Sequence, residues 1–232
     1  MKKNWKTVQV KEKSINFYQI LLDNNVLRTP FKNELVIPNA KIADEIYKEW
    51  NQETKFLNTD KMVFYGIMST SIDKIYGNRK LYIDDLLEFI NTDLICYRAE
   101  KPNDLVKWQK KNWDPIISEV EIYINNKINI FKGIMPLKQD KEIHLKITTL
   151  LTKFSDLEIA VLHRITNITG SIFLTLCILK NNKIKKNAFQ LSYLDELWQA
   201  KNWGYEEEAS KNRENINNEL NRIIYFLDCL RQ

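Results

Sequence analysis

Glycine, histidine and cysteine are scarce in this chain of 232 residues, and each scarcity excludes a class of site. The five glycines are scattered, whereas nucleotide-binding loops need glycines only a few residues apart. The two histidines, His144 and His163, lack the H-x-x-x-H spacing of a zinc site, and each is expected to be a surface or hydrogen-bonded helix residue. We therefore expect no metal and no cofactor.

The three cysteines, Cys96, Cys177 and Cys229, are far apart, odd in number and never spaced as C-x-x-C. This pattern argues against a disulfide framework or a zinc knuckle and indicates a reducing compartment. Arg98 lies close enough to Cys96 in sequence to lower the pKa of its thiol, but no histidine is nearby. We expect Cys96 to be a small core residue.

Long apolar runs are also absent. The longest, residues 171–179, is too short to span a bilayer and is predicted to form a helix buried on all sides. The N-terminal sequence MKKNWKTVQV lacks the apolar core of a signal peptide and is not an Arg/Ser-rich transit peptide. We therefore expect a cytoplasmic protein without membrane insertion.

Charge of one sign is not concentrated anywhere in the chain. The formal net charge is +5, and lysines and acids are interleaved along most of the sequence. The densest basic clusters, residues 107–111 and 183–186, are more typical of solvated helix ends or turns than of a phosphate-binding surface. We expect no nucleic-acid partner.

What the sequence does contain is a clear change of period. In the first forty residues, apolar and polar residues alternate around Val8 and Val10, and Asp23 begins a turn, which predicts a small antiparallel sheet. From Asn39, a suitable helix cap, the apolar spacing becomes that of helices. The predicted fold class is α+β. A small β-rich N-terminal domain with one helix, residues 1–60, precedes a larger α-helical C-terminal domain, residues 61–232.

Two further helix starts are predicted within the C-terminal domain. In NWDPII, Asp114 is expected to cap a helix whose first position is Pro115, where the missing N–H is not needed. Ser155 and Glu158 have the spacing of a capping box.

The stretch LSYLDELWQAKNWG, residues 191–204, is predicted to be a helix with two unlike faces. One face is an apolar arc bordered by Asp195. The opposite face carries Glu196 within a second, partly aromatic patch. The arc comprises Leu191, Leu194, Leu197 and Trp198, and the patch comprises Tyr193, Ala200 and Trp203.

Adjacent positions on a helix point about 100° apart, so Asp195 and Glu196 cannot face each other across a substrate as glycosidase carboxylates do. An unrecognised enzyme would need a distant partner for Asp195 or Glu196. A structural role, with the tryptophans beneath neighbouring helices and the acids paired, is a second alternative. The third is a docking surface for another protein, in which aromatic anchors surround a charge.

Six segments along the chain together resemble the chaperones that assemble the F(1) sector of ATP synthase, specifically the family that serves the alpha subunit. This family occurs in mitochondria and alpha-proteobacteria. The segments are LLDNNVLRTP (21–30), LVIPNAKIADEIYKEW (35–50), STSIDK (69–74), TDLICYRAE (92–100), NWDPII (112–117) and LSYLDELWQAKNWG (191–204).

The resemblance implies a β-rich α+β N-terminal domain and an α-helical C-terminal domain, as the periodicity does. It also implies that the protein is not an enzyme but a chaperone. It would bind the unassembled alpha subunit and shield its beta-facing interface until the ring forms. Its free form is expected to be a monomer in the cytoplasm of an alpha-proteobacterium, the counterpart of the mitochondrial matrix in eukaryotic relatives.

The family's critical acid best matches Glu196, with Asp195 beside it. By resemblance, these acids with Trp203 and Tyr193 are the expected client-binding residues. Trp50 matches a position important for the integrity of the family's fold. The chain departs from the family pattern at Leu197, where an acid or polar residue is expected. The expected structural residues are Trp50, Trp198 and Leu194.

Overall fold

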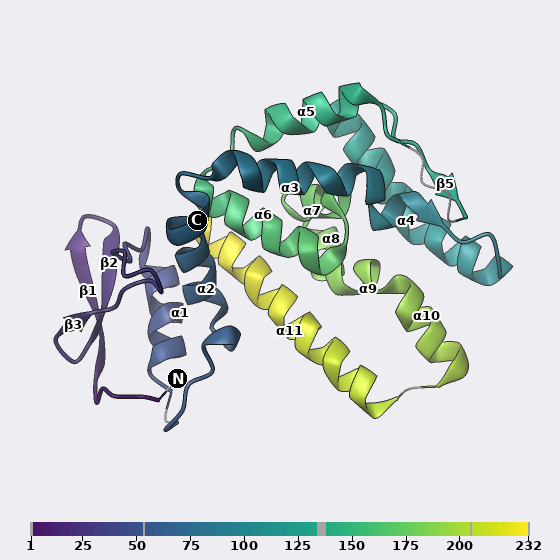
Figure 1. Cartoon of the computed structure of the whole chain (residues 1–232). Helices are drawn as coiled ribbons and strands as arrows, with labels where there is room; N and C mark the ends of the chain where they lie inside the picture. The colour runs from purple at the N-terminus through teal and green to yellow at the C-terminus, as the bar shows by residue number, and fades with distance from the viewer. Residues whose placement is uncertain (1, 53, 134–137, 205, 232) are drawn as a thin grey trace. The chain divides into compact units, whose positions relative to one another are not determined.

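The N-terminal part of the chain forms a three-stranded antiparallel sheet whose strands neighbour one another in chain order (Figure 1). Strand β1 (Val8–Ser14) forms a hairpin with β2 (Phe17–Leu22), and β3 (Asn25–Val26) pairs with the end of β2. Asp23, at the expected turn, accepts hydrogen bonds from the backbone N–H groups of residues 6 and 7. The predicted sheet is confirmed. The structure is a computed structural model that describes residues 2–52, 54–133, 138–204 and 206–231.

Helix α1 (Ala40–Trp50) covers this sheet and contacts both β1 and β2. Asn39 caps it, as predicted: its side-chain oxygen accepts the Ile42 N–H at 2.9 Å. The buried face of α1 includes Ile42 and Ile46, which are fully buried, as is Ile20 of β2. Burial of this apolar face joins helix and sheet into one core.

Acids and aromatic rings connect α1 to the segment that follows it. The carboxylate of Glu49 accepts the Phe64 N–H at 2.8 Å and the Tyr65 N–H at 2.9 Å, at the first turn of the next α-helix. Trp50 packs on Tyr65 edge-on and on Trp5 at a tilt, with ring centroids 5.0 and 5.2 Å apart. The elements of this segment are the short helix Thr59–Lys61, α2 (Val63–Thr70) and the π-turn Ser71–Ile75.

Helices dominate the rest of the chain, together with a two-stranded parallel pair, β4 and β5. Helix α7 is the buried helix predicted for residues 171–179, and all seven of its residues are buried. The elements are α3 (Arg79–Thr92), the short helix Leu94–Cys96, β4 (Tyr97–Arg98), α4 (Asn103–Ile124), β5 (Phe131–Lys132), α5 (Lys141–Leu151), α6 (Asp156–Thr169), α7 (Ile172–Ile178), α8 (Asn182–Lys186), α9 (Ala188–Ser192), α10 (Leu194–Trp203) and α11 (Glu207–Leu230).

The N-terminus of α7 is held by two polar side chains. Ser171 caps it by accepting the Leu174 N–H, and the carboxylate of Asp93 accepts the Phe173 N–H at 3.0 Å. Asp93 is fully buried, and this burial raises the pKa of its carboxyl group to about 7. Cys96, close by in the chain, is also fully buried, and burial raises the pKa of its thiol; its predicted core position is confirmed.

The helix start predicted at Asp114 and Pro115 is wrong, because α4 runs without interruption from Asn103 to Ile124 with Pro115 inside it. A proline in a helix removes one backbone hydrogen bond. Here Trp113, just before Pro115, is fully buried, and Ile116, just after it, is 1% exposed. This burial on both sides offsets the lost bond. The capping box of Ser155 and Glu158 is confirmed by reciprocal hydrogen bonds.

The chain groups into two compact units. One comprises Met1–Arg79, Ser155–Val161 and Asn221–Gln232, and the other comprises Lys80–Phe154 and Leu162–Leu220. The chain is 63% helical, with a small antiparallel sheet followed by a larger helical region, so the predicted α+β fold class is confirmed. The boundary after residue 60 stays a proposal. No helix in the described ranges combines the length and the apolarity needed to cross a bilayer.

Candidate functional site

Helix α10 carries the two acids singled out in the sequence and belongs to the compact unit formed by Lys80–Phe154 and Leu162–Leu220. Three of its residues pack it against the rest of that unit. Leu194, Trp198 and Ala200 are 2%, 7% and 8% exposed. The indole Nε1 of Trp198 donates to a carboxylate oxygen of Asp104 at 3.3 Å. One side of α10 is therefore a packed surface.

Asp195 lies at the border of this packed surface and is held by α4. The side-chain amide of Gln109 donates to both oxygens of the Asp195 carboxylate, at 2.9 and 3.1 Å. Gln109 is 1% exposed, and its own oxygen accepts the Ala99 N–H at 2.9 Å. Burial raises the pKa of Asp195, while the Gln109 hydrogen bonds and the charge of Arg98 partly offset that rise. This carboxylate thus ties α10 to α4.

Arg98 extends this network to three segments that are far apart in sequence. It is 8% exposed, donates from Nε to the Ile95 carbonyl at 2.9 Å and pairs with the Asp114 carboxylate at 3.1 Å. Its guanidinium lies 5.1 Å from the ring centroid of Trp113, whose Nε1 donates to the Leu191 carbonyl at 2.8 Å. The segments 92–100, 112–117 and 191–204, three of the six that carry the family resemblance, therefore meet in one place.

Glu196, next to Asp195, has a different environment. Its side chain is exposed, and within the described part of the chain it has no hydrogen-bond or ion-pair partner. It lies in the first turn of α10, where a negative charge is favourable beside the unpaired N–H groups. The two adjacent acids therefore differ: Asp195 is bound within the protein, and Glu196 faces solvent.

Two aromatic residues were grouped with Glu196 from the sequence. Trp203, at the end of α10, is 76% exposed, and its ring stands edge-on to that of Trp198 with centroids 5.7 Å apart. Tyr193, just before α10, is half-buried and stacks on Phe189 at 4.7 Å. Burial and the nearby negative charge of Glu196 raise the pKa of Tyr193. Trp203 is thus available to a partner, whereas one face of the Tyr193 ring is covered by Phe189 of α9.

Trp50 belongs to the other compact unit and is buried at 4% exposure between Trp5 and Tyr65. This burial supports the structural role proposed for it.

Acid–base and metal chemistry find little support at these residues. The partner of Asp195 is an amide, Gln109, which holds a carboxylate but does not exchange a proton with it at neutral pH. His144 and His163 lie on helices, 3.4 Å from the side-chain oxygen of Asn91 and 3.2 Å from that of Asp85. Among the residues with described positions, no group of three or more His, Cys, Asp or Glu could hold a metal ion.

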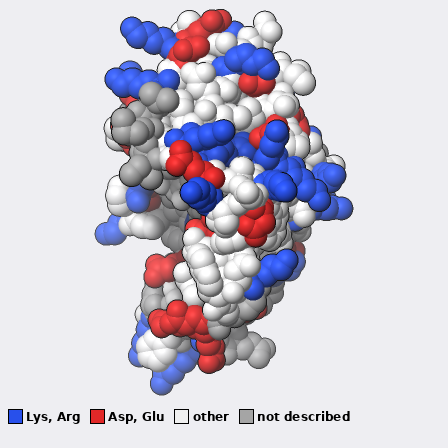
Figure 2. Space-filling model, turned by 90° about the vertical axis from the view of Figure 1, so that its right-hand side faces the viewer, with Lys and Arg blue, Asp and Glu red and all other residues white. Residues whose placement is uncertain are grey.

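The face of the molecule drawn in Figure 2 gives no clear nucleic-acid surface. Figure 2 shows acidic and basic side chains on the same face, with the basic ones gathered across its middle next to uncharged surface. A phosphate-tracking surface would need a basic stripe with few acids among it.

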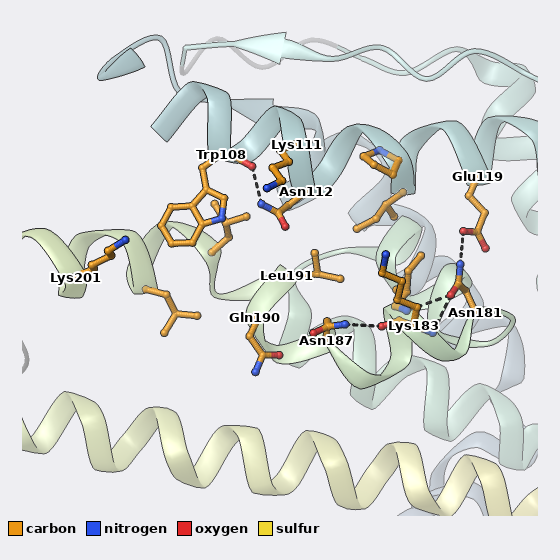
Figure 3. A pocket seen from close by; sticks show the side chains of 15 residues that line it. Trp108, Lys111, Asn112, Glu119, Asn181, Lys183, Asn187, Gln190, Leu191 and Lys201 are labelled. Atoms are coloured by element: carbon orange, nitrogen blue, oxygen red, sulfur yellow. Dashed lines mark hydrogen bonds between the residues drawn. The ribbon is translucent and has the colours of Figure 1, made fainter. Parts of the chain in front are cut away.

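A groove of about 710 Å³ lies between α4 and the segment from Asn181 to Lys201, on the side of α10 that carries Leu197 (Figure 3). All of its lining residues belong to the same compact unit as α10. This groove and the positions of Gln109 and Arg98 near Asp195 were not predicted from the sequence, because each depends on contacts between segments far apart in the chain.

Comparison with known proteins gives consistent matches. Residues 2–121 match the family model described as ATP12 chaperone protein. The mitochondrial protein atp12 of Schizosaccharomyces pombe is 24% identical over 224 residues, which are 91% of this chain and 77% of that protein.

Solved structures agree over nearly the whole chain. A crystal structure of a candidate chaperone from Agrobacterium tumefaciens has a TM-score of 0.90 and 31% identity, covering 99% of this chain and 86% of that one. The crystal structure of Atp12 from Paracoccus denitrificans, and that of its mutant with lysine in place of an aspartate, each have a TM-score of 0.86 and 26% identity, covering 98% of this chain and 97% of theirs.

Proposed function

This chain belongs to the ATP12 chaperone family, as the sequence resemblance predicted, and hence to the chaperones of F1-ATPase assembly; we propose that its client is the alpha subunit. In this proposal the protein binds unassembled alpha subunit and shields the surface that later meets the beta subunit. It releases the alpha subunit when the ring forms.

The observation that carries the proposal is the division of α10 into a bound side and a free side. Leu194, Trp198 and Asp195 fix the helix in place, while Glu196 and Trp203 remain exposed. A large aromatic side chain and an unpaired charge on the same face of a helix that buried contacts hold in place suit recognition of another protein. In the proposal these two residues contact the client, and Asp195 and Tyr193 shape the surface around them.

The proposed mechanism is passive holding. An orphan alpha subunit exposes a subunit interface, and such exposed apolar surfaces aggregate. A chaperone needs enough affinity to cover that surface, but less than the ring provides, so that beta subunit displaces it. Apolar contacts supply the affinity, while Glu196 facing a basic client residue supplies register and a faster encounter.

The location follows from the family in the same way. We place the protein in the cytoplasm of an alpha-proteobacterium, as a monomer when free, and its eukaryotic counterparts in the mitochondrial matrix. It requires no nucleic acid, cofactor or membrane insertion in this role.

Co-expression of the tagged protein with the alpha subunit tests the proposal. Soluble alpha subunit is expected to co-purify with the tagged protein, and added beta subunit is expected to release it. An unrelated tagged protein of similar charge is the control. A folded protein that retains no alpha subunit, or that retains it equally well in excess beta subunit, contradicts the proposal.

A further inference from the structure

The groove beside α10 has a floor suited to apolar side chains. Ile116 of α4, Leu191 of α9 and Leu194 of α10 are buried or nearly so along it, and Leu197 is half-exposed over it. Figure 3 shows Trp108 projecting from α4 and Leu191 from the facing segment, and both line the groove. Trp108 and Leu197 are only half-buried, and the apolar surface that they leave open gains free energy when another apolar group covers it.

The rim of the groove has the opposite character. Lys111 of α4, Lys183 of α8 and Lys201 of α10 line it, and all three are exposed. Across the described ranges neither Lys111 nor Lys183 has an ion-pair partner, and Lys201 lies 5.7 Å from the ring centroid of Trp108. Three positive charges around an apolar floor attract an occupant with negative charge.

One carboxylate, that of Glu119, also lines the groove, and it already accepts a hydrogen bond from within the protein. Glu119 accepts a hydrogen bond at 2.8 Å from the side-chain amide of Asn181, the residue that caps α8. This hydrogen bond does not remove the charge of Glu119, but one carboxylate against three lysines leaves the lining of the groove with an excess of positive charge.

The size of the groove decides what kind of occupant it holds. Its volume of about 710 Å³ lies within the range of roughly 300–1,000 Å³ typical of small-ligand pockets. A stable protein interface buries about 800 Å² on each partner, which is more than such a groove provides alone. A short stretch of chain fits, whereas a folded surface does not.

We propose that the groove between α4, α8, α9 and α10 binds a short segment of the alpha subunit whose apolar side chains are flanked by carboxylates. The apolar side chains cover Leu197 and Trp108, and the carboxylates pair with Lys111 and Lys183. This inference rests on the proposed function, because the alpha subunit is the client assumed there.

Its position makes the groove a second contact, distinct from Glu196 and Trp203. At about 100° per residue, Leu194, Leu197 and Lys201 share one face of α10, and Glu196 and Trp203 lie on a face well over 90° away. A client that contacts both faces is bound at two places, so the second contact raises the effective affinity of the chaperone for it.

Charge reversal on the rim is the first test. The double variant Lys111→Glu/Lys183→Glu is expected to retain about tenfold less alpha subunit than wild type, because two attractions become repulsions. The matched control is Lys107→Glu/Lys110→Glu, which makes the same charge change on exposed lysines of α4 that do not line the groove. The control is expected to retain alpha subunit within about twofold of wild type. Equal retention by the two double variants overturns the inference.

Photo-crosslinking identifies the occupant. A benzoylphenylalanine at position 197, half-exposed in the groove, is expected to crosslink to an alpha-subunit segment in which Asp or Glu flank apolar residues. Crosslinks to a second copy of this chain, or to an alpha segment without acids, overturn the inference. The proposed function still holds in that case if the wild type retains alpha subunit. If wild type retains no alpha subunit, the proposed function fails and this inference falls with it.

Discussion

Helices α1 and α10 each carry carboxylates and tryptophans, but these residues have different environments on the two helices. In α1, Glu49 is 6% exposed and binds the N-terminus of α2, and Trp50 beside it is 4% exposed. In α10, Glu196 is exposed without a partner in the described chain, and Trp203 is 76% exposed. The same residue types form part of the core in one helix and an open surface in the other.

The difference arises from what the rest of the chain brings to each helix. Arg222, almost at the end of the chain, pairs with Glu45 at 2.6 Å and approaches Glu49 at 3.4 Å. Among the residues that the structure describes, none pairs with Glu196 in this way, while Gln109 binds its neighbour Asp195. Acids with internal partners hold helices in place, and an acid without one is free to act on another molecule.

The largest effect is expected when Trp50 and Trp203 are each replaced by arginine, which tests whether one is buried and the other exposed. Trp50→Arg places an unpaired charge in the core and removes ring contacts with Trp5 and Tyr65, so unfolding should become easier by about 3–5 kcal/mol. For a chain of this size that lowers the melting temperature by about 10 °C. Trp203→Arg, at an exposed position, is the matched control and should shift the melting temperature by only about 2 °C. Calorimetry or circular dichroism measures both.

Equal melting temperatures for Trp50→Arg and wild type would place Trp50 outside the core. A large loss of stability in Trp203→Arg would make Trp203 a structural residue and remove it from the proposed client surface.

Removal of the Asp195 carboxylate should have an intermediate effect. Asp195→Ala leaves the buried amide of Gln109 without its acceptor, and an unsatisfied buried donor costs about 1–3 kcal/mol. A double-mutant cycle with Gln109→Ala isolates the pair and should give a coupling of at least about 0.5 kcal/mol. Additive effects in that cycle would show that the hydrogen bonds between α4 and α10 do not stabilise the fold.

Local signals in the sequence predicted much of the fold. Alternation around Val8 predicted the sheet, and Asn39 and Ser155 marked helix starts that the structure confirms, because a cap acts within one turn of chain. Pro115 misled for the same reason: the start signal is local, whereas the burial of Trp113 and Ile116 that keeps α4 continuous comes from packing against other segments.

Only part of the candidate site could be predicted from the sequence. The single helix predicted for residues 191–204 is wrong, because the helical structure is interrupted at Tyr193, where α9 ends at Ser192 and α10 begins at Leu194. The wheel still separated Asp195 from Glu196 correctly, since both lie on α10 and their separation follows from helix geometry alone. It could not show that Gln109 binds Asp195 or that the charge of Arg98 acts on it, nor that Ala200, grouped with the aromatic patch, is 8% exposed. Those facts depend on which segments meet after folding.

The most direct test of the account is the effect of Glu196→Lys on client binding and on stability, measured together. The matched control is Glu142→Lys, which reverses the charge of an exposed glutamate in the first turn of another helix, α5. Both variants should lose only about 0.3–1 kcal/mol of stability, since each places a cation beside a helix N-terminus. Glu196→Lys should retain at least about tenfold less alpha subunit, while Glu142→Lys retains it as wild type does. If Glu196→Lys stays folded and retains the alpha subunit as well as the control, Glu196 is not the client-facing acid and the central claim is wrong.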